Sequence, residues 1–214
     1  MELEHIINSY CKNHAINVHS IINDSFINGP GKRIVVWFHG CPFHCSGCFN
    51  PQMWDFENKT IISVKELAQI INQYDGDGVT FSGGEPMIQA PSFLELLLLI
   101  EQRNFKKGII CFTGCESEEI NSTSIIKECI DHIDLSIIGR YDKNQLRKNY
   151  IGGSSNQQFV FLNKKGRGRD KISEDEILID NDIEIHYSGD NMCITGYPNI
   201  NKEKLIQLGI TILE

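Results

Sequence analysis

The chain has 214 residues, of which 41% are hydrophobic and 22% are charged, and this composition is typical of a globular protein. The length suits one domain, or one domain with an appendage, and the composition excludes wholesale disorder and a coiled coil. The formal net charge of −8 disfavours bulk binding to nucleic acid, because a negative surface repels phosphates.

The sequence also indicates where the protein works. No apolar run approaches the roughly 18 residues that a membrane helix needs, so we expect no membrane association. The first four residues include two glutamates and no basic residue, so they lack a positive n-region, and we expect no secretory signal and a cytoplasmic location. In that reducing compartment, the eight cysteines are expected to bind metal, to act in catalysis or to remain free thiols.

Signals for helices and strands alternate along the chain. Apolar spacing over 2–13 predicts a short amphipathic helix, and the run over 34–38 predicts a strand. The elements expected next are a helix from Ser63 to about Tyr74, a strand over 79–81, a helix over 91–104, a strand over 108–112, a helix over 117–130 and strands over 133–138 and 159–162. This order predicts an α/β domain with a mainly parallel sheet.

The pattern changes near residue 164. Two apolar runs, over 183–186 and 192–195, flank a polar turn and predict a β-hairpin, and 201–208 is expected to be a short final helix. We therefore divide the chain into three parts. They are an N-terminal helical extension over 1–15, a core over 16–163 and a C-terminal appendage over 164–214.

The loop from Gly40 to Asn50, called the cysteine loop below, carries three cysteines with CxxxCxxC spacing. They are Cys41, Cys45 and Cys48. Three thiolates can hold three irons of a [4Fe–4S] cluster, which leaves the fourth iron open to a small chelating molecule. A structural zinc ion would need a fourth ligand, which His39 or His44 can supply, so a zinc site is the alternative.

A second loop, called the glycine loop below, follows the predicted strand over 79–81. It consists of Ser82, Gly83, Gly84, Glu85 and Pro86. Glycine allows the backbone to approach a ligand at positions where a Cβ atom would block it. Taken alone, this loop also fits an ordinary turn between a strand and a helix.

Together the two loops resemble those of the radical S-adenosylmethionine (SAM) enzymes, and among them the anaerobic ribonucleotide reductase activating proteins and their relatives. The resemblance covers about residues 16–162. The further matching motifs are Asn28-Gly29-Pro30-Gly31-Lys32-Arg33, Cys48-Phe49-Asn50-Pro51, Trp54, Thr113-Gly114, Asp134, Gly139-Arg140-Tyr141-Asp142 and Gly153-Ser154-Ser155-Asn156-Gln157.

This resemblance implies a partial (β/α) barrel of the radical SAM type. It also implies reductive cleavage of SAM at a [4Fe–4S] cluster, which gives a 5′-deoxyadenosyl radical. Cys41, Cys45 and Cys48 are the expected iron ligands. The expected SAM-binding residues are Asn50, Ser82, Gly83, Gly84, Glu85, Pro86 and Thr113.

More detailed expectations concern how SAM is held. The backbone of the glycine loop or the Glu85 carboxylate is expected to accept hydrogen bonds from the SAM ammonium. Phe43 and Phe49 are the candidates for an apolar contact with adenine. A Gly84→Val substitution is expected to block SAM and to leave the cluster in place.

The resemblance also implies partners. The first interpretation is an activase that installs a glycyl radical on a partner such as anaerobic ribonucleotide reductase, with a flavodoxin or ferredoxin as electron donor. The second is a radical SAM enzyme that modifies a small molecule or peptide beneath the appendage. The third is a non-catalytic iron–sulfur or zinc module.

Two remaining features carry open alternatives. The segment 140–171 holds nine basic and two acidic residues in a chain of net charge −8, and it predicts either a docking surface or a solvated loop. The cysteines outside the cysteine loop could hold an auxiliary cluster, but they are scattered, and we expect mostly buried free thiols there. They are Cys11, Cys111, Cys115, Cys129 and Cys193.

Overall fold

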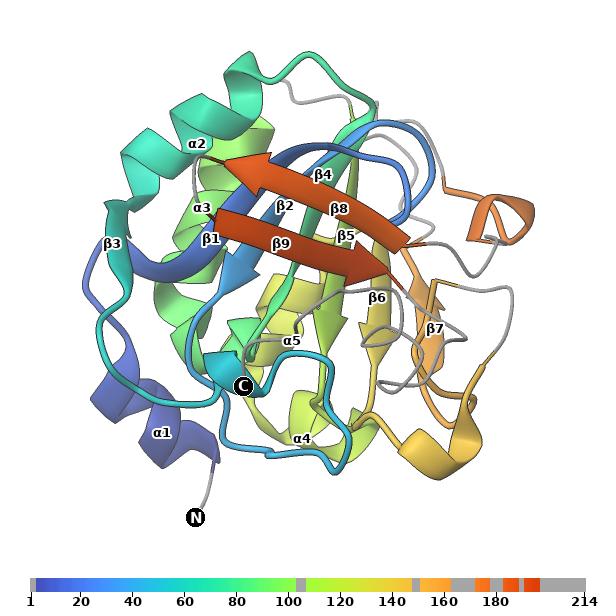
Figure 1. The fold of residues 1–214 in the computed structure, drawn as a ribbon. Coiled ribbons are helices and arrows are strands. Elements are labelled where there is room, and N and C mark those ends of the chain that lie inside the picture. The colour runs from blue at the N-terminus through green and yellow to red at the C-terminus, as the bar shows by residue number, and fades with distance from the viewer. Residues whose placement is uncertain are drawn as a thin grey trace.

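Figure 1 shows a computed structural model of the chain, which describes residues 3–102, 107–147, 151–162, 172–177, 183–188 and 191–196. Within them, one seven-stranded sheet has the order β3-β1-β2-β4-β5-β6-β7, and β8 and β9 form a separate hairpin. The strands are β1 (Ala15–Ser25), β2 (Arg33–Phe38), β3 (Thr60–Ser63), β4 (Gly78–Gly83), β5 (Gly108–Thr113), β6 (Leu135–Ile138), β7 (Gln158–Phe161), β8 (Ile183–Ser188) and β9 (Asn191–Gly196).

The centre of the sheet is parallel and its edges are antiparallel. β2, β4, β5 and β6 pair in parallel, whereas β1 runs antiparallel to β2 and β3, and β7 runs antiparallel to β6. The predicted α/β class is therefore confirmed, with a parallel core. Because the four central strands point the same way, the loops that follow them meet at one edge of the sheet, called the carboxyl edge below.

Helices cover one face of this sheet. They are α1 (Leu3–Tyr10), α2 (Val64–Gln73), α3 (Ala90–Gln102), α4 (Ser117–Ser122) and α5 (Ser124–Ile130). The Ser63 side chain accepts a hydrogen bond from the Glu66 amide, so α2 begins at the N-cap that the sequence predicts. A buried core between the sheet and α2, α3 and α5 includes the mutually packed rings of Phe38, Phe81 and Phe93.

The other face of the sheet is covered by later parts of the chain. Ile177 is buried in a cluster with residues of β5 and β6, and its carbonyl accepts a hydrogen bond from the Ile151 amide at 3.1 Å. The hairpin β8–β9 also crosses in front of the sheet in Figure 1. It is tied to the turn before β2, where Asn28 Nδ2 donates to Thr195 Oγ1 at 3.1 Å. The described residues of 164–214 thus pack against the core.

Several predicted elements differ in the structure. The strands β1 and β3 were not predicted, and the helix predicted over 117–130 is interrupted at Thr123, where the backbone is extended. The N-terminal helix ends at Tyr10. The predicted hairpin is present, whereas the predicted helix over 201–208 lies outside the described residues. In the described part of the chain, no helix has the length and apolar character needed to cross a membrane.

Candidate functional site

The cysteine loop continues directly from β2 at the carboxyl edge of the sheet. Its start is fixed by backbone hydrogen bonds on two sides. The Gly40 amide donates to the Met53 carbonyl at 2.9 Å, and the Gly40 carbonyl accepts from the Glu85 amide at 2.8 Å. The two loops that the sequence singled out are therefore in direct contact.

The thiols of the cysteine loop are unbridged and half-buried. The Asn50 amide points at Cys48 Sγ over 3.4 Å, as an N–H donor does toward an anionic sulfur. Burial, followed by the negative charge of Glu85, raises the pKa of the Cys41 thiol to about 12. This thiol therefore keeps its proton at neutral pH until a metal displaces it.

The arrangement of these thiols can be compared with the needs of two metal centres. A single zinc ion needs sulfur ligands that converge on one point, about 2.3 Å from each. In the described residues, no three Cys, His, Asp or Glu side chains converge in this way. A [4Fe–4S] cluster distributes three thiolates over three irons and has no such requirement. Three half-buried thiols in one loop therefore fit a cluster.

The glycine loop lies against the backbone of β2 and of the cysteine loop. A Cβ atom on Gly83, whose φ is +112°, would lie 2.4 Å from the Phe38 backbone. A Cβ atom on Gly84 would lie 2.2 Å from the Gly40 carbonyl oxygen. The added side chain of Gly84→Val would displace the residue next to Cys41, so we now expect this variant to disturb the cysteine loop as well as to block SAM.

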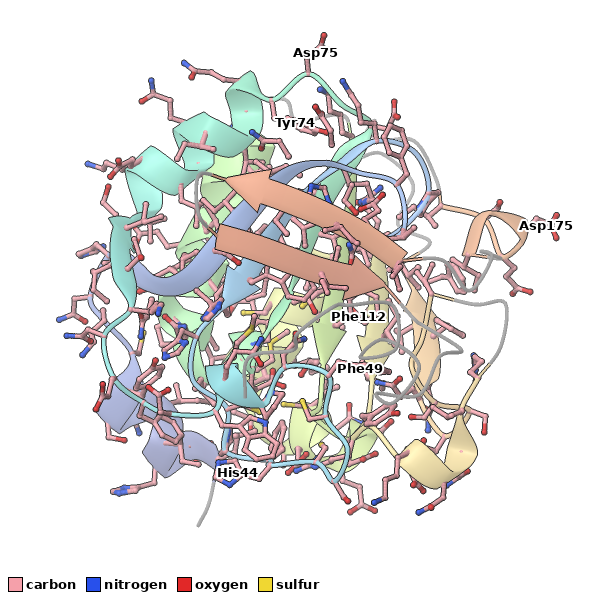
Figure 2. The ribbon with its side chains drawn as sticks, in the orientation of Figure 1. His44, Phe49, Tyr74, Asp75, Phe112 and Asp175 are labelled. Carbon is pink, nitrogen blue, oxygen red and sulfur yellow. The ribbon has the colours of Figure 1, made fainter. Side chains whose placement is uncertain are left out.

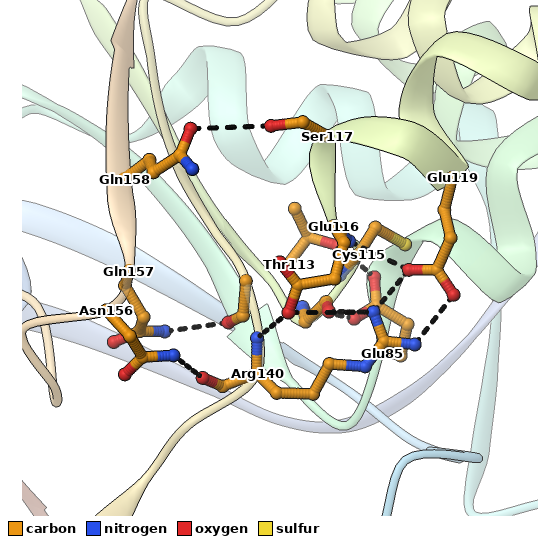
Figure 3. Close-up of polar contacts among 12 residues, drawn as sticks. Glu85, Thr113, Cys115, Glu116, Ser117, Glu119, Arg140, Asn156, Gln157 and Gln158 are labelled. Carbon is orange, nitrogen blue, oxygen red and sulfur yellow. Dashed lines mark hydrogen bonds and ion pairs between the residues drawn. The ribbon is translucent and has the colours of Figure 1, made fainter. Parts of the chain in front are cut away.

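Glu85 is buried, with 1% of its surface exposed. Its Oε1 accepts hydrogen bonds from the Met87 amide at 2.9 Å and the Thr113 hydroxyl at 2.7 Å, and its Oε2 accepts from the Gly114 amide at 2.7 Å. Figure 3 shows Glu85 beside Thr113. Burial raises the pKa of this carboxyl to about 7, and the hydrogen bonds from Thr113 and the two amides oppose that rise. Glu85 and Thr113 thus join the glycine loop to the end of β5.

The other predicted SAM-binding residues lie at the same edge. Ser82 is half-buried near the end of β4, and Pro86 begins the 3-10 helix η2 (Pro86–Gln89). Asn50 occupies the N-cap position of the 3-10 helix η1 (Pro51–Met53), but its side chain makes no capping hydrogen bond. The Asn50 side chain is therefore not used to cap this helix.

Aromatic side chains differ in how much of the ring they expose. Phe49 is 45% exposed and its ring centroid lies 5.1 Å from that of Tyr141. His44 is exposed and stacks on Trp54 at 4.7 Å, and Figure 2 places His44 and Phe49 in the same lower part of the molecule. Phe43 is half-buried, so Phe49 offers the larger apolar surface of the two adenine candidates.

One contact of the cysteine loop was missed by the sequence analysis. The guanidinium carbon of Arg140 lies 3.9 Å from the centroid of the Phe43 ring. Gly114 packs against the same ring, since a Cβ atom there would lie 2.5 Å from it. Arg140 also donates to the Gly114 carbonyl at 2.8 Å and to both oxygens of Glu119 (Figure 3). The available signal was its place in the motif Gly139-Arg140-Tyr141-Asp142, two residues after the predicted strand over 133–138.

The basic segment 140–171 is only partly described. Within it, Arg140 binds Glu119, and Arg147 donates to the Ser155 carbonyl at 3.0 Å. Both arginines therefore serve contacts inside the chain. Residues 148 and 164–171, which carry most of the remaining basic charge, lie outside the described residues, so the docking surface stays a prediction.

Cysteines outside the cysteine loop behave as the sequence predicts where they are described. Cys111, Cys115 and Cys129 are buried free thiols, and Cys11 is half-buried and unbridged. Burial raises the pKa of each of the three buried thiols. The side chain of Cys193 lies outside the described residues.

An α/β sheet with a three-cysteine loop at its carboxyl edge defines this molecule as an iron–sulfur protein. A family model described as a 4Fe-4S single cluster domain matches residues 27–160. The chain belongs to this family, within the radical SAM enzymes that include the activating proteins of anaerobic ribonucleotide reductases. Membership implies a [4Fe–4S] cluster and SAM as cofactors.

Two curated relatives and one solved structure illustrate the similarity. The anaerobic ribonucleoside-triphosphate reductase-activating protein of Enterobacteria phage T4 is 32% identical over 148 residues, which are 67% of this chain and 92% of that protein. The pyruvate formate-lyase-activating enzyme of Clostridium pasteurianum is 31% identical over 126 residues, 55% of this chain and 53% of that protein. The match with the crystal structure of QueE from Escherichia coli covers 60% of this chain and 72% of the QueE chain, with 15% sequence identity and a TM-score of 0.39.

Proposed function

We propose that this protein is a radical SAM activase that installs a glycyl radical on a partner enzyme. The observation that carries the proposal is the family match over 27–160, which includes a cysteine loop and a glycine loop joined by the Glu85–Gly40 hydrogen bond. Relatives that activate two different enzymes, a ribonucleotide reductase and a formate-lyase, support the class of reaction.

Cys41, Cys45 and Cys48 hold the cluster in this proposal. Their three thiolates would bind three irons and leave the fourth open to SAM. The bound cluster would supply the one electron for reductive cleavage of SAM, and this chemistry would remove a hydrogen atom from a glycine of the partner. The products are 5′-deoxyadenosine, methionine and the glycyl radical.

The remaining residues of the site bind and orient SAM. Since the Glu85 carboxylate already accepts three hydrogen bonds, the backbone carbonyls of Ser82, Gly83 and Gly84 are the acceptors we propose for the SAM ammonium. Glu85, Thr113 and Pro86 act by fixing that backbone. The Asn50 side chain makes no capping bond and is proposed as a polar contact to SAM, and Phe49 as the contact to adenine.

The partner is proposed to approach from the carboxyl edge of the sheet. Ile177 and the hairpin β8–β9 cover the face opposite the helices, so a substrate cavity on that face would require their displacement. The cysteine loop, in contrast, exposes Ser46, Gly47 and Phe49. An exposed loop suits a polypeptide partner, as an activase requires. The proposal also includes three further points. They are a partial (β/α) barrel as the fold, a flavodoxin or ferredoxin as the electron donor, and a cytoplasmic location.

The test is transfer of the radical under anaerobic conditions. Reconstituted protein, SAM and dithionite would be mixed with the anaerobic ribonucleotide reductase from the same source, and the glycyl radical measured by electron paramagnetic resonance (EPR). A glycyl signal that depends on all three components, and that is lost with Cys45→Ala, is the expected result. Release of 5′-deoxyadenosine without a glycyl signal would contradict the activase proposal. Zinc without iron after reconstitution would contradict the cluster itself.

A further inference from the structure

We propose that Arg140 is a positioning residue that holds the cysteine loop through Phe43, and that its charge helps to set the reduction potential of the bound cluster. The inference goes beyond the proposed function, and it rests on that function only in taking Cys41, Cys45 and Cys48 as the iron ligands.

Phe43 lies two residues from both Cys41 and Cys45, so the position of its ring constrains the segment between two proposed ligands. The ring has the Arg140 guanidinium at 3.9 Å and packs closely against Gly114. A cation–π contact of this kind attracts the guanidinium to the face of the ring and so holds the ring in place. Loss of the contact would therefore loosen the loop without removing any ligand.

Arg140 is itself held in place by its hydrogen bonds. Its two terminal nitrogens donate to both oxygens of Glu119, one of them also donates to the Gly114 carbonyl, and its backbone amide donates to Glu116 Oε1 at 3.0 Å. A planar guanidinium can donate along its edge and stack through its face at the same time. A lysine ammonium at this position would keep the charge but lose the stacking geometry.

The charges around Arg140 give the second half of the inference. Reduction adds one electron to the cluster, so a nearby positive charge favours the reduced form and a nearby negative charge disfavours it. Arg140 opposes Glu119 directly and Glu116 at 3.9 Å. Removal of the arginine leaves two carboxylates uncompensated, whereas removal of the Glu119 charge leaves the arginine less compensated. The two changes should shift the potential in opposite directions.

The experiment compares the reduced fraction of the cluster in variants reconstituted anaerobically, without SAM. Each protein would be equilibrated with dithionite and mediator dyes at a fixed potential, and reduced cluster counted by EPR. Arg140→Gln should lower the ratio of reduced to oxidised cluster at least threefold, and Glu119→Gln should raise it at least threefold. Gln at position 119 still accepts a hydrogen bond, so Arg140 keeps a partner.

Two further variants separate positioning from charge. Arg140→Lys should keep the ratio of reduced to oxidised cluster within twofold of the wild type, but should lose iron to a chelator at least threefold faster. Arg147→Gln is the matched control, because Arg147 also stacks on a phenylalanine, Phe159, at 4.6 Å, in a segment outside the cysteine loop. It should change neither the ratio nor the rate of iron loss.

Shifts of the same sign in Arg140→Gln and Glu119→Gln, or no shift in either, would overturn the inference. If Arg140→Gln retains no cluster, the Glu119→Gln variant alone decides it, and an unchanged ratio there would refute the charge effect. Iron loss from Arg140→Lys at the wild-type rate would refute the positioning role. The ligand assignment is tested separately, by the iron content of Cys45→Ala.

Discussion

Gly84→Ala is the smallest substitution that tests how the two loops are joined. The added Cβ atom would lie 2.2 Å from the Gly40 carbonyl oxygen and 3.0 Å from the Met53 carbonyl oxygen, and both of these are backbone atoms. A comfortable contact is about 3.5 Å, so the Gly40 carbonyl must retreat by roughly 1 Å. That carbonyl belongs to the peptide that continues into Cys41.

The expected loss of stability follows from two terms. Overpacking of this kind costs about 1–3 kcal/mol. Loss of the hydrogen bond from the Glu85 amide to the Gly40 carbonyl costs about 1 kcal/mol more. Alanine also lowers the conformational entropy of the unfolded chain, which stabilises the folded state by about 0.4–1 kcal/mol. We expect the free energy of unfolding to fall by about 1–4 kcal/mol and the cluster to be retained poorly.

The assay combines urea unfolding of metal-free protein with iron content after anaerobic reconstitution. Gly152→Ala is the matched control, because the nearest atom to its Cβ would be the Phe159 ring at 3.3 Å, which can adjust. That variant should stay within about 0.5 kcal/mol of the wild type and bind iron normally. Wild-type stability and iron content in Gly84→Ala would refute the packing argument.

Three further outcomes are expected. Replacement of any one proposed iron ligand by alanine should reduce bound iron at least tenfold and abolish the cluster EPR signal, whereas Cys129→Ala, at a buried free thiol, should leave both intact. Burial raises the folded-state pKa of Glu85 from 4.5 to about 7. The free energy of unfolding of the metal-free wild type, measured in urea relative to Glu85→Gln, should therefore fall by up to about 3 kcal/mol as the pH rises from 4.5 through 7. It should change little above pH 7. Arg33→Met should lower the free energy of unfolding by about 3–5 kcal/mol in the same assay, yet iron per folded chain should not change. The reason is that the buried guanidinium donates to Thr80 and to the carbonyls of Pro30, Val79 and Gly108.

The meeting of the two loops could be predicted from the sequence because it depends on strand direction. Each loop directly follows a short, β-branched strand, and parallel strands bring their carboxyl ends to one edge. The pairing of Trp37 with Ser82, and of Phe38 with Gly83, places the loops side by side. No information beyond two strands and their order was needed.

The strand β1 could not be predicted because its pattern is interrupted. Two register shifts against β2 break the alternation of buried and exposed residues, and Asn17 is buried within it. Asn17 instead satisfies its side chain with the Glu57 carbonyl, the Lys59 amide and the Tyr10 hydroxyl. With a buried polar residue and two bulges, the apolar residues of this segment follow neither the period of a helix nor that of a strand.

The Arg140–Phe43 contact was hidden for a different reason, since its partners are far apart in sequence and the motif that contains Arg140 does not indicate which residue it contacts. Their contact follows only once β2 and β6 are placed in the same sheet, with β4 and β5 between them. The same placement connects Glu85, after β4, to Gly114, after β5. Three strand ends thus hold the cysteine loop through bonds that involve no cysteine. These contacts fix the backbone of the cysteine loop at Gly40 and at Phe43, on either side of Cys41. We therefore expect the residues that follow β4, β5 and β6 to hold the loop backbone, and the three proposed ligand cysteines to supply the sulfur atoms.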